Sequence, residues 1–334
     1  MSEHAELVWH NGEILPYESI AIGLGNQSLN YGLCVIEGIS VWPSPSRAYQ
    51  IFRLREHLDR FAASCALVGV GLPWTTDRLM AACHEAVAAN GMWRAYLRPL
   101  AVLGEGVLGL ARAGSVADVA ILLYDTSRFD QAVRGREVRL TTSSVIRSSP
   151  RAVPAKAKVS AGYLNSRLAL MDAQDRGFDD AVLLDEDGYV AECSVQNLFA
   201  VRGRTVLVPE SAAALDGITV ACAAELARHL GLTVSRRRLG LDELLGCDAV
   251  CVTSTAAGVR PVSGIDETAF DVGNEVIAAL RDAYDRAERG LLPAFAHWNA
   301  EPGTASTTAS DVAPGSLPGP VPGRAPEVAP VSPP

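Results

Sequence analysis

The chain has 334 residues, of which 49% are hydrophobic and 20% charged, a length and composition typical of a two-domain protein with a well-packed interior. Its formal net charge of −9 argues against nucleic-acid binding, because phosphate groups attract proteins with basic surfaces. The longest apolar runs, such as residues 119–124, fall far short of the ~20 residues that span a membrane, so we expect no membrane segment.

The residues at the start of the chain contain neither a basic nor an apolar stretch, so we expect no secretion signal. Seven cysteines, an odd number without a regular spacing, indicate reduced thiols and a cytoplasmic protein. Cys247 and Cys251 lack the second pair of ligands that a zinc site needs, so we expect no metal. We interpret the basic triplet Arg236-Arg237-Arg238 as the solvated edge of a strand.

Strands and helices alternate in the N-terminal part. Asn11-Gly12 is a dipeptide that favours a tight hairpin turn between two short strands. Thr76 and the pair Asn90-Gly91 mark the two ends of a helix. The elements predicted here are, in chain order, strands at 7–9 and 13–15, a helix at 76–90, and strands at 94–103 and 118–124.

A polar, weakly patterned segment then leads into a second unit, and the chain ends in a stretch that holds nearly half of the 19 prolines and almost no large apolar side chains. Such a stretch predicts a disordered tail. The elements predicted in the second unit are a strand at 138–142, a helix at 160–176, a hairpin around 185–188, a helix at 219–230 and a strand at 249–253. We therefore predict an α/β fold of the α+β type, with a smaller N-terminal α/β domain (1–124), an interdomain linker (125–136), a larger C-terminal domain (137–295) and a disordered Pro-rich tail (296–334).

Lysine occurs only twice, at Lys156 and Lys158, and every other basic side chain among the 29 is arginine. A buried lysine amine can lose its proton near neutral pH, whereas a guanidinium cannot, so a Schiff base or an amine general base requires lysine. One of the two is therefore a candidate catalytic amine. Positions two apart on an extended segment face the same way, so the pattern does not choose between them, and two solvated residues remain the alternative.

Two turns of small residues have the composition of anion sites. Asp216-Gly217-Ile218-Thr219 begins a helix, whose free N–H groups and dipole attract negative charge, although Thr219 is equally suited to be an ordinary N-cap. Residues 253–258 (TSTAAG) follow a strand, and their small side chains allow backbone amides to approach a phosphate or carboxylate. An ordinary tight turn is the alternative for this segment.

A lysine together with two anion-binding turns suggests a phosphorylated aldehyde cofactor, pyridoxal phosphate. Such a site also needs a carboxylate beside the pyridine nitrogen, and Glu192, on the strand after the second-unit hairpin, is a candidate. Tyr163, about one turn beyond Lys158, is a candidate for the ring hydroxyl or an ordinary helix aromatic. A GxGxxG pattern at residues 104–109 follows a strand, but no long helix follows it, so we reject a dinucleotide site there.

Taken together, segments in collinear order from about Leu7 to Tyr284 resemble the fold-type IV pyridoxal-phosphate enzymes, specifically the branched-chain amino acid aminotransferases of class IV. The segments that carry the resemblance are Asn30-Tyr31-Gly32 with Glu37-Gly38, residues 53–60 (RLREHLDR), residues 95–100 (AYLRPL), the Lys158 segment, Glu192 through Asn197-Leu198-Phe199, Gly217-Ile218-Thr219 and Thr255-Ala256-Ala257.

The resemblance implies a Schiff base between pyridoxal 5′-phosphate and Lys158, which follows Pro154 by four residues and precedes Tyr163 by five. It places Tyr163 at the phenolic oxygen of the cofactor and Glu192 at its ring nitrogen, and it requires no lysine at the position of Lys156. The residues that it implies around the phosphate are Arg60, Gly217, Ile218, Thr219 and Thr255.

For the substrate, the resemblance implies that the amides of Ala256 and Ala257 bind the α-carboxylate. The residues implied around the rest of the substrate are Tyr31, Ile36, Tyr96 and Arg98. Among them Arg98 is expected to bind the distal carboxylate of glutamate or 2-oxoglutarate, because a guanidinium offers a planar two-pronged donor. The resemblance also implies a homodimer, in which the 104–109 loop helps to close the neighbouring subunit's site.

The implied reaction is transamination between an L-amino acid, branched-chain or otherwise hydrophobic, and 2-oxoglutarate or another 2-oxo acid, with the Lys158 amine moving a proton. Three positions depart from the family pattern. Ile36 replaces a usual phenylalanine, residues 124–127 (YDTS) replace an aromatic stretch, and Val220 replaces a frequent arginine. The first two departures predict a reshaped side-chain pocket, and the Pro-rich tail is also atypical.

Other activities on the same fold remain alternatives. They are an elimination of the aminodeoxychorismate lyase type, a D-amino acid aminotransferase, and a non-catalytic protein that binds pyridoxal phosphate. The segment Tyr96-Leu97-Arg98 favours the L-branched-chain type, and the complete set of catalytic residue types favours an enzyme.

Overall fold

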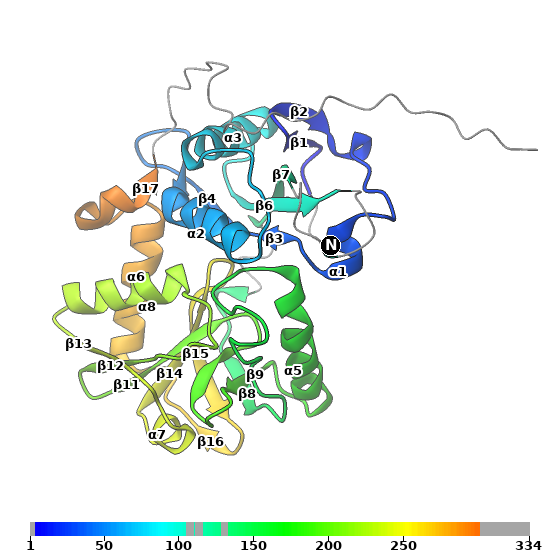
Figure 1. The fold of residues 1–334 in the computed structure, drawn as a ribbon. Coiled ribbons are helices and arrows are strands. Elements are labelled where there is room, and N and C mark those ends of the chain that lie inside the picture. Colours follow the sequence, from blue (N-terminus) through cyan, green and yellow to red (C-terminus); the bar gives the residue numbers. More distant parts are fainter. Residues whose placement is uncertain (1–3, 105–109, 111–115, 128–132, 301–334) are drawn as a thin grey trace, which may run out of the picture.

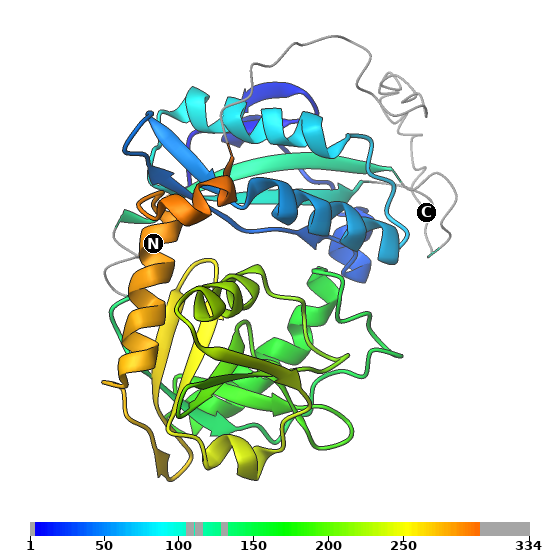
Figure 2. The ribbon, with the colours of Figure 1, turned by 90° about the vertical axis from the view of Figure 1, so that its left-hand side faces the viewer.

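The computed structural model describes residues 4–104, 110, 116–127 and 133–300 of the chain. Two sheets with helices packed against them lie one above the other in Figure 1. Helix α8 (Glu275–Glu288) runs along one side of the lower half and leads the chain back to the upper half, which is clearest in Figure 2. The architecture agrees with the predicted mixed α/β fold.

The first sheet has eight strands among the described residues, in the order β17-β5-β4-β6-β7-β1-β2, with β3 paired to β6. Helices α2 (Leu54–Leu67) and α3 (Thr76–Asn90) pack on the sheet through their buried apolar faces and, with its central strands, form the core of this half. A short helix, α1 (Gln27–Tyr31), precedes β3. The strands are β1 (Leu7–His10), β2 (Glu13–Pro16), β3 (Val35–Ile36), β4 (Ile39–Pro43), β5 (Tyr49–Phe52), β6 (Ala95–Leu103), β7 (Ala117–Asp125) and β17 (Asn299–Ala300).

Local sequence signals place these elements well. Asn11 and Gly12 have φ angles of 46° and 102°, which the tight turn between β1 and β2 requires, so the predicted hairpin is confirmed. The helix predicted at 76–90 is also confirmed, but its N-cap is Thr75 rather than Thr76. The Oγ1 atom of Thr75 accepts a hydrogen bond from the backbone N–H of Arg78 at 3.2 Å.

The second sheet has nine strands among the described residues, in the order β10-β9-β8-β15-β14-β11-β12-β13, with β16 paired to β15. Helices α6 (Ile218–His229) and α8 pack on one side of it around a second core. The described residues of this half also form η2 (Ser160–Gly162), α5 (Tyr163–Asp175) and α7 (Leu241–Leu245). The strands are β8 (Val138–Thr142), β9 (Asp180–Leu184), β10 (Val190–Cys193), β11 (Asn197–Arg202), β12 (Thr205–Pro209), β13 (Thr233–Arg237), β14 (Ala249–Ser254), β15 (Gly258–Ile265) and β16 (Thr268–Ala269).

Two boundaries in this half differ slightly from the prediction. The helix expected at 160–176 is divided into the single turn η2 and helix α5. The helix expected at 219–230 begins at Ile218 with Gly217 as its N-cap, so Thr219 lies inside its first turn. The arginine triplet at 236–238 is exposed, and among the described strands β13 pairs with β12 alone, at the sheet edge, as predicted.

Regular structure continues a few residues past 295, near which the sequence predicted the end of the globular part. Residues Pro293–Trp298 form the helical segment η3, and β17 pairs antiparallel with β5 of the first sheet. Trp298 is 1% exposed and packs edge-on to Phe52, with 5.9 Å between ring centroids. The chain therefore returns to the first half after α8, where burial of the Phe295 and Trp298 rings stabilises the segment. An average over the proline-rich composition does not show these two residues.

Three predicted segments fall wholly or partly outside the described residues: 105–109 of the GxGxxG loop, 128–132 of the linker, and 301–334 of the tail. Within the described ranges, no helix combines the length and apolar composition needed to cross a membrane.

Candidate active site

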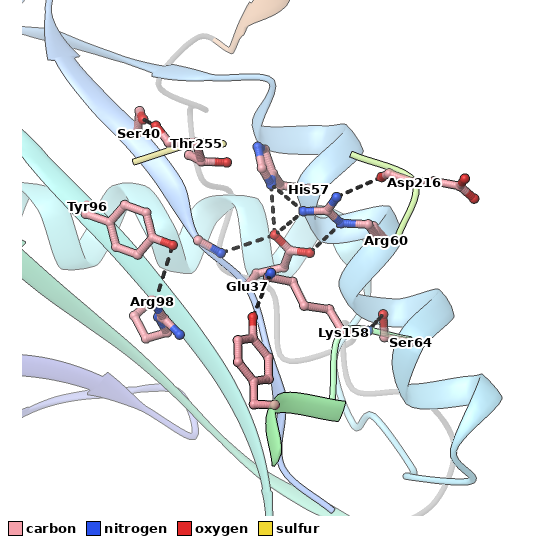
Figure 3. A network of polar contacts seen from close by, with 12 residues as sticks. Glu37, Ser40, His57, Arg60, Ser64, Tyr96, Arg98, Lys158, Asp216 and Thr255 are labelled. Carbon is pink, nitrogen blue, oxygen red and sulfur yellow. Dashed lines mark hydrogen bonds and ion pairs between the residues drawn. The ribbon is translucent and has the colours of Figure 1, made fainter. Parts of the chain in front are cut away.

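Lys158 lies on the extended segment before η2, where backbone hydrogen bonds tie it to the first half of the molecule. Its N–H donates to Ser64 Oγ of α2 at 3.1 Å, and its carbonyl accepts from the N–H of Ile36 on β3 at 3.0 Å. Its amine Nζ donates to Tyr163 Oη at 2.9 Å (Figure 3). The backbone is thus fixed by elements of the first half, while the amine is oriented by the first residue of α5.

Lys156 has a different environment. Its amine pairs with Asp216 Oδ1 at 2.7 Å, and the two side chains are 41% and 78% exposed. The contact joins the lysine segment to the turn before α6. Sequence alone does not choose between the lysines. The structure places Lys158, but not Lys156, among the described residues that line a cavity with Tyr163.

Glu192 of β10 lines the same cavity as Lys158 and Tyr163. Its Oε2 atom accepts hydrogen bonds from Asn197 Nδ2 at 3.1 Å and from the backbone N–H of Leu215 at 3.2 Å. Its Oε1 atom is buried and has no hydrogen-bond donor among the described residues. Three residues predicted for one site from separate segments are therefore brought together.

Arg147 is a buried partner of Glu192 that the sequence reasoning missed. Its Nε lies 2.8 Å from Glu192 Oε1 as an ion pair, although the orientation does not satisfy hydrogen-bond geometry. Its Nη1 donates to Asn165 Oδ1 at 3.0 Å and to Ser166 Oγ at 3.2 Å, which fixes the guanidinium. Burial raises the pKa of Glu192, and the charge of Arg147 opposes that rise. In a chain rich in arginine, no local signal distinguishes this one.

The N-terminus of α6 offers polar groups close to Arg60, although Gly217, Ile218 and Thr219 are not among the residues that line the Lys158 cavity. Its first backbone N–H groups have no carbonyl partners within the helix and carry the positive end of the helix dipole. A side chain at Gly217 would collide with Asn197 Oδ1, so a glycine is needed for this close approach. Ile218 and Thr219, both predicted around a phosphate, are the first two residues of the helix.

Arg60 of α2 borders this terminus. Its Nη1 donates to the carbonyl of Asp216 at 2.9 Å, directly before Gly217. Its other nitrogens bind Glu37, with Nε at 2.6 Å from Oε1 and Nη2 at 2.9 Å from Oε2 (Figure 3). A fixed cation thus stands beside free helix N–H groups, an arrangement suited to an anion such as phosphate.

Glu37 and His57 support Arg60 from the interior, and neither was assigned a role from sequence. Glu37 is fully buried and accepts from His57 Nδ1 at 2.8 Å and from the N–H of Gly38 at 3.1 Å. Burial alone would raise the pKa of Glu37, but Arg60 and His57 outweigh it and hold that pKa well below its usual range. Burial lowers the pKa of His57, so the imidazole is neutral and its Nδ1 carries the proton donated to the carboxylate.

The turn between β14 and β15 carries Thr255, Ala256 and Ala257. The Thr255 carbonyl accepts from Ser40 Oγ of β4 at 3.2 Å, a contact across the two halves of the molecule. The Ala257 N–H donates to Ser254 Oγ at 3.2 Å. Within the described residues, the N–H of Ala256 has no hydrogen-bond acceptor.

The residues predicted around the substrate come from three nearby elements. Tyr96 and Arg98 alternate on β6 and share a face, with Arg98 Nη2 donating to Tyr96 Oη at 3.4 Å. The Tyr96 hydroxyl occupies the space where a side chain at Gly38 would lie. Ile36 is bound to the Lys158 backbone, and Tyr31 is the last residue of α1.

The chain matches the model of the family described as "Amino-transferase class IV" over residues 35–265. It is similar to the branched-chain-amino-acid aminotransferase of Pseudomonas aeruginosa, with 30% identity over 302 residues that cover 89% of this chain and 98% of that one. It is also similar to the enzyme of the same name from Escherichia coli, with 31% identity over 268 residues that cover 79% and 86% of the two chains.

Solved structures agree with this match. The T.th. branched-chain amino acid aminotransferase with pyridoxamine 5′-phosphate has a TM-score of 0.85 and 37% identity, with 90% of this chain and 99% of that chain covered. The Escherichia coli enzyme has a TM-score of 0.83 and 29% identity, with coverage of 90% and 100%. The family and the fold-type IV architecture expected from the sequence are thereby confirmed. The chain belongs to the class IV aminotransferases.

Proposed function

We propose that the protein transfers an amino group between an L-amino acid and a 2-oxo acid, with pyridoxal 5′-phosphate bound at Lys158. The observation that carries the proposal is the position of the Lys158 amine. It lies 2.9 Å from Tyr163 Oη in a cavity that Glu192 also lines. Family membership supports the same reaction, since the relatives are named aminotransferases.

The residues present fit this cofactor. Glu192 is a buried carboxylate, held by Arg147 at 2.8 Å, that lines the cavity with Lys158, and a carboxylate in this position suits a protonated pyridine nitrogen. The N-terminus of α6 and Arg60 offer several N–H donors and positive charge for a phosphate. When bound, pyridoxal phosphate supplies an aldehyde for the lysine and a ring that accepts the electrons released at the substrate α-carbon.

Each group of this chain then has a task. The Lys158 amine takes the proton from the substrate α-carbon and later returns one, and Tyr163 orients that amine through its hydroxyl. Burial raises the pKa of Glu192, and Arg147 and the Leu215 N–H oppose that rise, so these contacts favour the ionised carboxylate that would keep a proton on the ring nitrogen.

The substrate carboxylate is assigned to the turn at Ala256 and Ala257, where the Ala256 N–H lacks a described acceptor. Arg98 is assigned to the distal carboxylate of glutamate or 2-oxoglutarate, because its buried Nε has no described hydrogen-bond partner. The T.th. relative was solved in complex with N-(5′-phosphopyridoxyl)-L-glutamate, which supports an acidic substrate in this family.

The other substrate is a hydrophobic L-amino acid. The relatives named branched-chain-amino-acid aminotransferases support this class. Ile36 has a smaller side chain than the phenylalanine usual in the family at this position. We therefore expect the preference among amino donors to differ from one for Leu, Ile and Val. A panel of amino donors with 2-oxoglutarate tests both statements. Conversion of no L-amino acid would contradict the proposed function, whereas Leu, Ile and Val as the three best donors would contradict only the altered preference.

We also propose a homodimer. Apolar side chains before and within α1 are exposed, with Ile22 at 58%, Leu24 at 86% and Leu29 at 62%. Leu164 at 67% and Leu168 at 48% form an exposed apolar stripe on α5, which lies beside α1 in Figure 1. Such a surface is typical of a protein–protein contact. Light scattering on the purified protein tests the proposed dimer, and a monomer would contradict it.

All seven cysteines are free thiols, which supports a cytoplasmic location.

A further inference from the structure

Arg134, at the end of the interdomain linker, holds the turn that carries Thr255 and Ala256. Its Nη2 donates to the Thr255 carbonyl at 3.1 Å, and its Nε donates to the Ala256 carbonyl at 3.2 Å. One guanidinium thus binds two successive carbonyls of the same turn. The turn also connects the paired strands β14 and β15.

The guanidinium itself is fixed from the other side by Glu288 at the end of α8. Nη1 donates to Glu288 Oε2 at 2.6 Å and Nη2 donates to Oε1 at 3.1 Å, a two-pronged pair with a fully buried carboxylate. The Arg134 side chain also lies 4.8 Å from the ring of Trp42 on β4. Because a buried charge pair is costly to break, Arg134 has one strongly preferred orientation.

Peptide geometry transmits this orientation to the amides. In a planar trans peptide, the C=O and the following N–H point in opposite directions. Fixing the carbonyls of Thr255 and Ala256 toward Arg134 therefore directs the N–H groups of Ala256 and Ala257 to the opposite side. The Ala257 N–H meets Ser254 Oγ there, while the Ala256 N–H has no acceptor within the described residues.

We propose that Arg134 is a positioning residue for the substrate carboxylate, acting through the turn rather than by contact with the substrate. It holds the Ala256 amide toward the site, and a hydrogen bond accepted at a carbonyl also makes the attached N–H a stronger donor. The inference rests on the proposed function, which assigns the substrate carboxylate to this turn. Glu288 of α8 and Trp42 of β4 would act one step further from the substrate, because they hold Arg134 in place.

The test compares Arg134→Lys with the matched control Arg289→Lys, both as holoenzymes. Arg289 lies 5.0 Å from the same Trp42 ring, but none of the described hydrogen bonds joins its side chain to the turn. Lysine at 134 keeps the charge for Glu288 and cannot bridge two carbonyls and a carboxylate. The probe is 4-methylvaleric acid, a carboxylate without an amino group that was found bound to the T.th. relative.

Calorimetry should give a dissociation constant for 4-methylvaleric acid that rises about tenfold in Arg134→Lys and stays unchanged in Arg289→Lys. In turnover, KM for both the amino acid and the 2-oxo acid should rise by a similar factor, with kcat within about threefold of wild type. Reaction with 3-methylbutylamine, which has no carboxylate, should be unaffected. An equal loss for the amine and the amino acid would overturn the proposal, as would an unchanged dissociation constant.

Glu288→Gln keeps Arg134 but weakens its support, and should change the same constants in the same direction by a smaller factor. It carries the test if Arg134→Lys does not fold, and an unchanged dissociation constant in it would then overturn the inference. Failure of the proposed function is seen separately, because it would appear in the wild type as the absence of both amino-acid conversion and 4-methylvaleric acid binding.

Discussion

Glu37 holds Arg60 with both carboxylate oxygens, 2.6 Å from Nε and 2.9 Å from Nη2, at a fully buried position between β3 and β4 (Figure 3). The pair is completed by His57 and directs the remaining Arg60 nitrogen toward the α6 terminus. The anion site that we propose at Arg60 and the α6 terminus is therefore supported by an interior ion pair, and we expect its affinity for phosphate to depend on Glu37 and His57.

The first prediction concerns that pair. Glu37→Gln should raise the dissociation constant for pyridoxal phosphate by about tenfold or more, because Arg60 loses the charge that orients it. Titration of the apoprotein with the cofactor measures this. Arg55 and Asp77 form an exposed pair at 2.6 Å, so Asp77→Asn is the control and should leave the constant unchanged. Equal constants for Glu37→Gln and wild type would show that Arg60 does not need this partner.

His57 gives a pH dependence of stability. Burial lowers its pKa in the folded state, so the unfolded chain binds more protons as pH falls below about 6.5. Its contribution is therefore present above the unfolded pKa and is lost as pH falls from there toward the lower folded pKa. Replacing it in His57→Asn, whose amide can donate to Glu37, should flatten the fall in Tm between about pH 7 and pH 5. Identical slopes for the two proteins would count against a neutral His57.

The third prediction concerns Arg147, which pairs with Glu192, the proposed partner of the cofactor ring nitrogen. In Arg147→Met, the pKa of Glu192 should rise further, because burial raises it already and the opposing charge is removed. The rate of the first half-reaction should fall about tenfold or more while the cofactor remains bound. Stopped-flow absorbance measures that rate, and Arg147→Lys, which keeps the charge, should lose less. A wild-type rate in Arg147→Met would exclude a role in holding Glu192 ionised.

The fourth prediction concerns the contribution of the segment η3–β17, which contains Trp298, to the stability of the fold. Trp298→Ala should lower the free energy of unfolding by about 3–5 kcal/mol, because a fully buried aromatic leaves a large cavity. Trp93, which is 38% exposed, is the control, and Trp93→Ala should have a clearly smaller effect. Chemical denaturation provides both values. Equal losses would mean that the return of the chain to the first sheet contributes little to stability.

Much of the fold was predictable because its signals are local. The Asn11-Gly12 hairpin, the capped helix at 76–90, and the strand before and the helix after the Lys158 segment follow from turn chemistry, capping and apolar periodicity. Trp298 shows where such reasoning fails. In a prediction from average composition, the prolines of the neighbouring stretch outweigh one aromatic residue, although Trp298 is buried and packs in η3.

The sequence predicted the residues proposed to contact the cofactor, but not the residues that hold them in place. Lys158, Tyr163 and Glu192 were proposed from residue type, spacing and resemblance, and the structure brings them to one cavity. Arg147 and Arg134 escaped notice because their partners, Glu192 and Glu288, are distant in sequence and arginine is abundant. Glu37 did give a signal, since a lone carboxylate in an apolar strand segment, followed by His57 and Arg60 on one helix face, indicates a buried polar network.

The most direct measurement is the visible absorption spectrum of the purified wild type, Lys158→Ala and Lys156→Ala in the presence of pyridoxal phosphate. Lys156 is the matched control, because its amine pairs with Asp216 at an exposed position two residues away. We expect the band of the lysine-bound cofactor in the wild type and in Lys156→Ala, and its loss in Lys158→Ala. A band that survives in Lys158→Ala, or that disappears only in Lys156→Ala, would contradict the assignment of Lys158 as the residue that binds the cofactor.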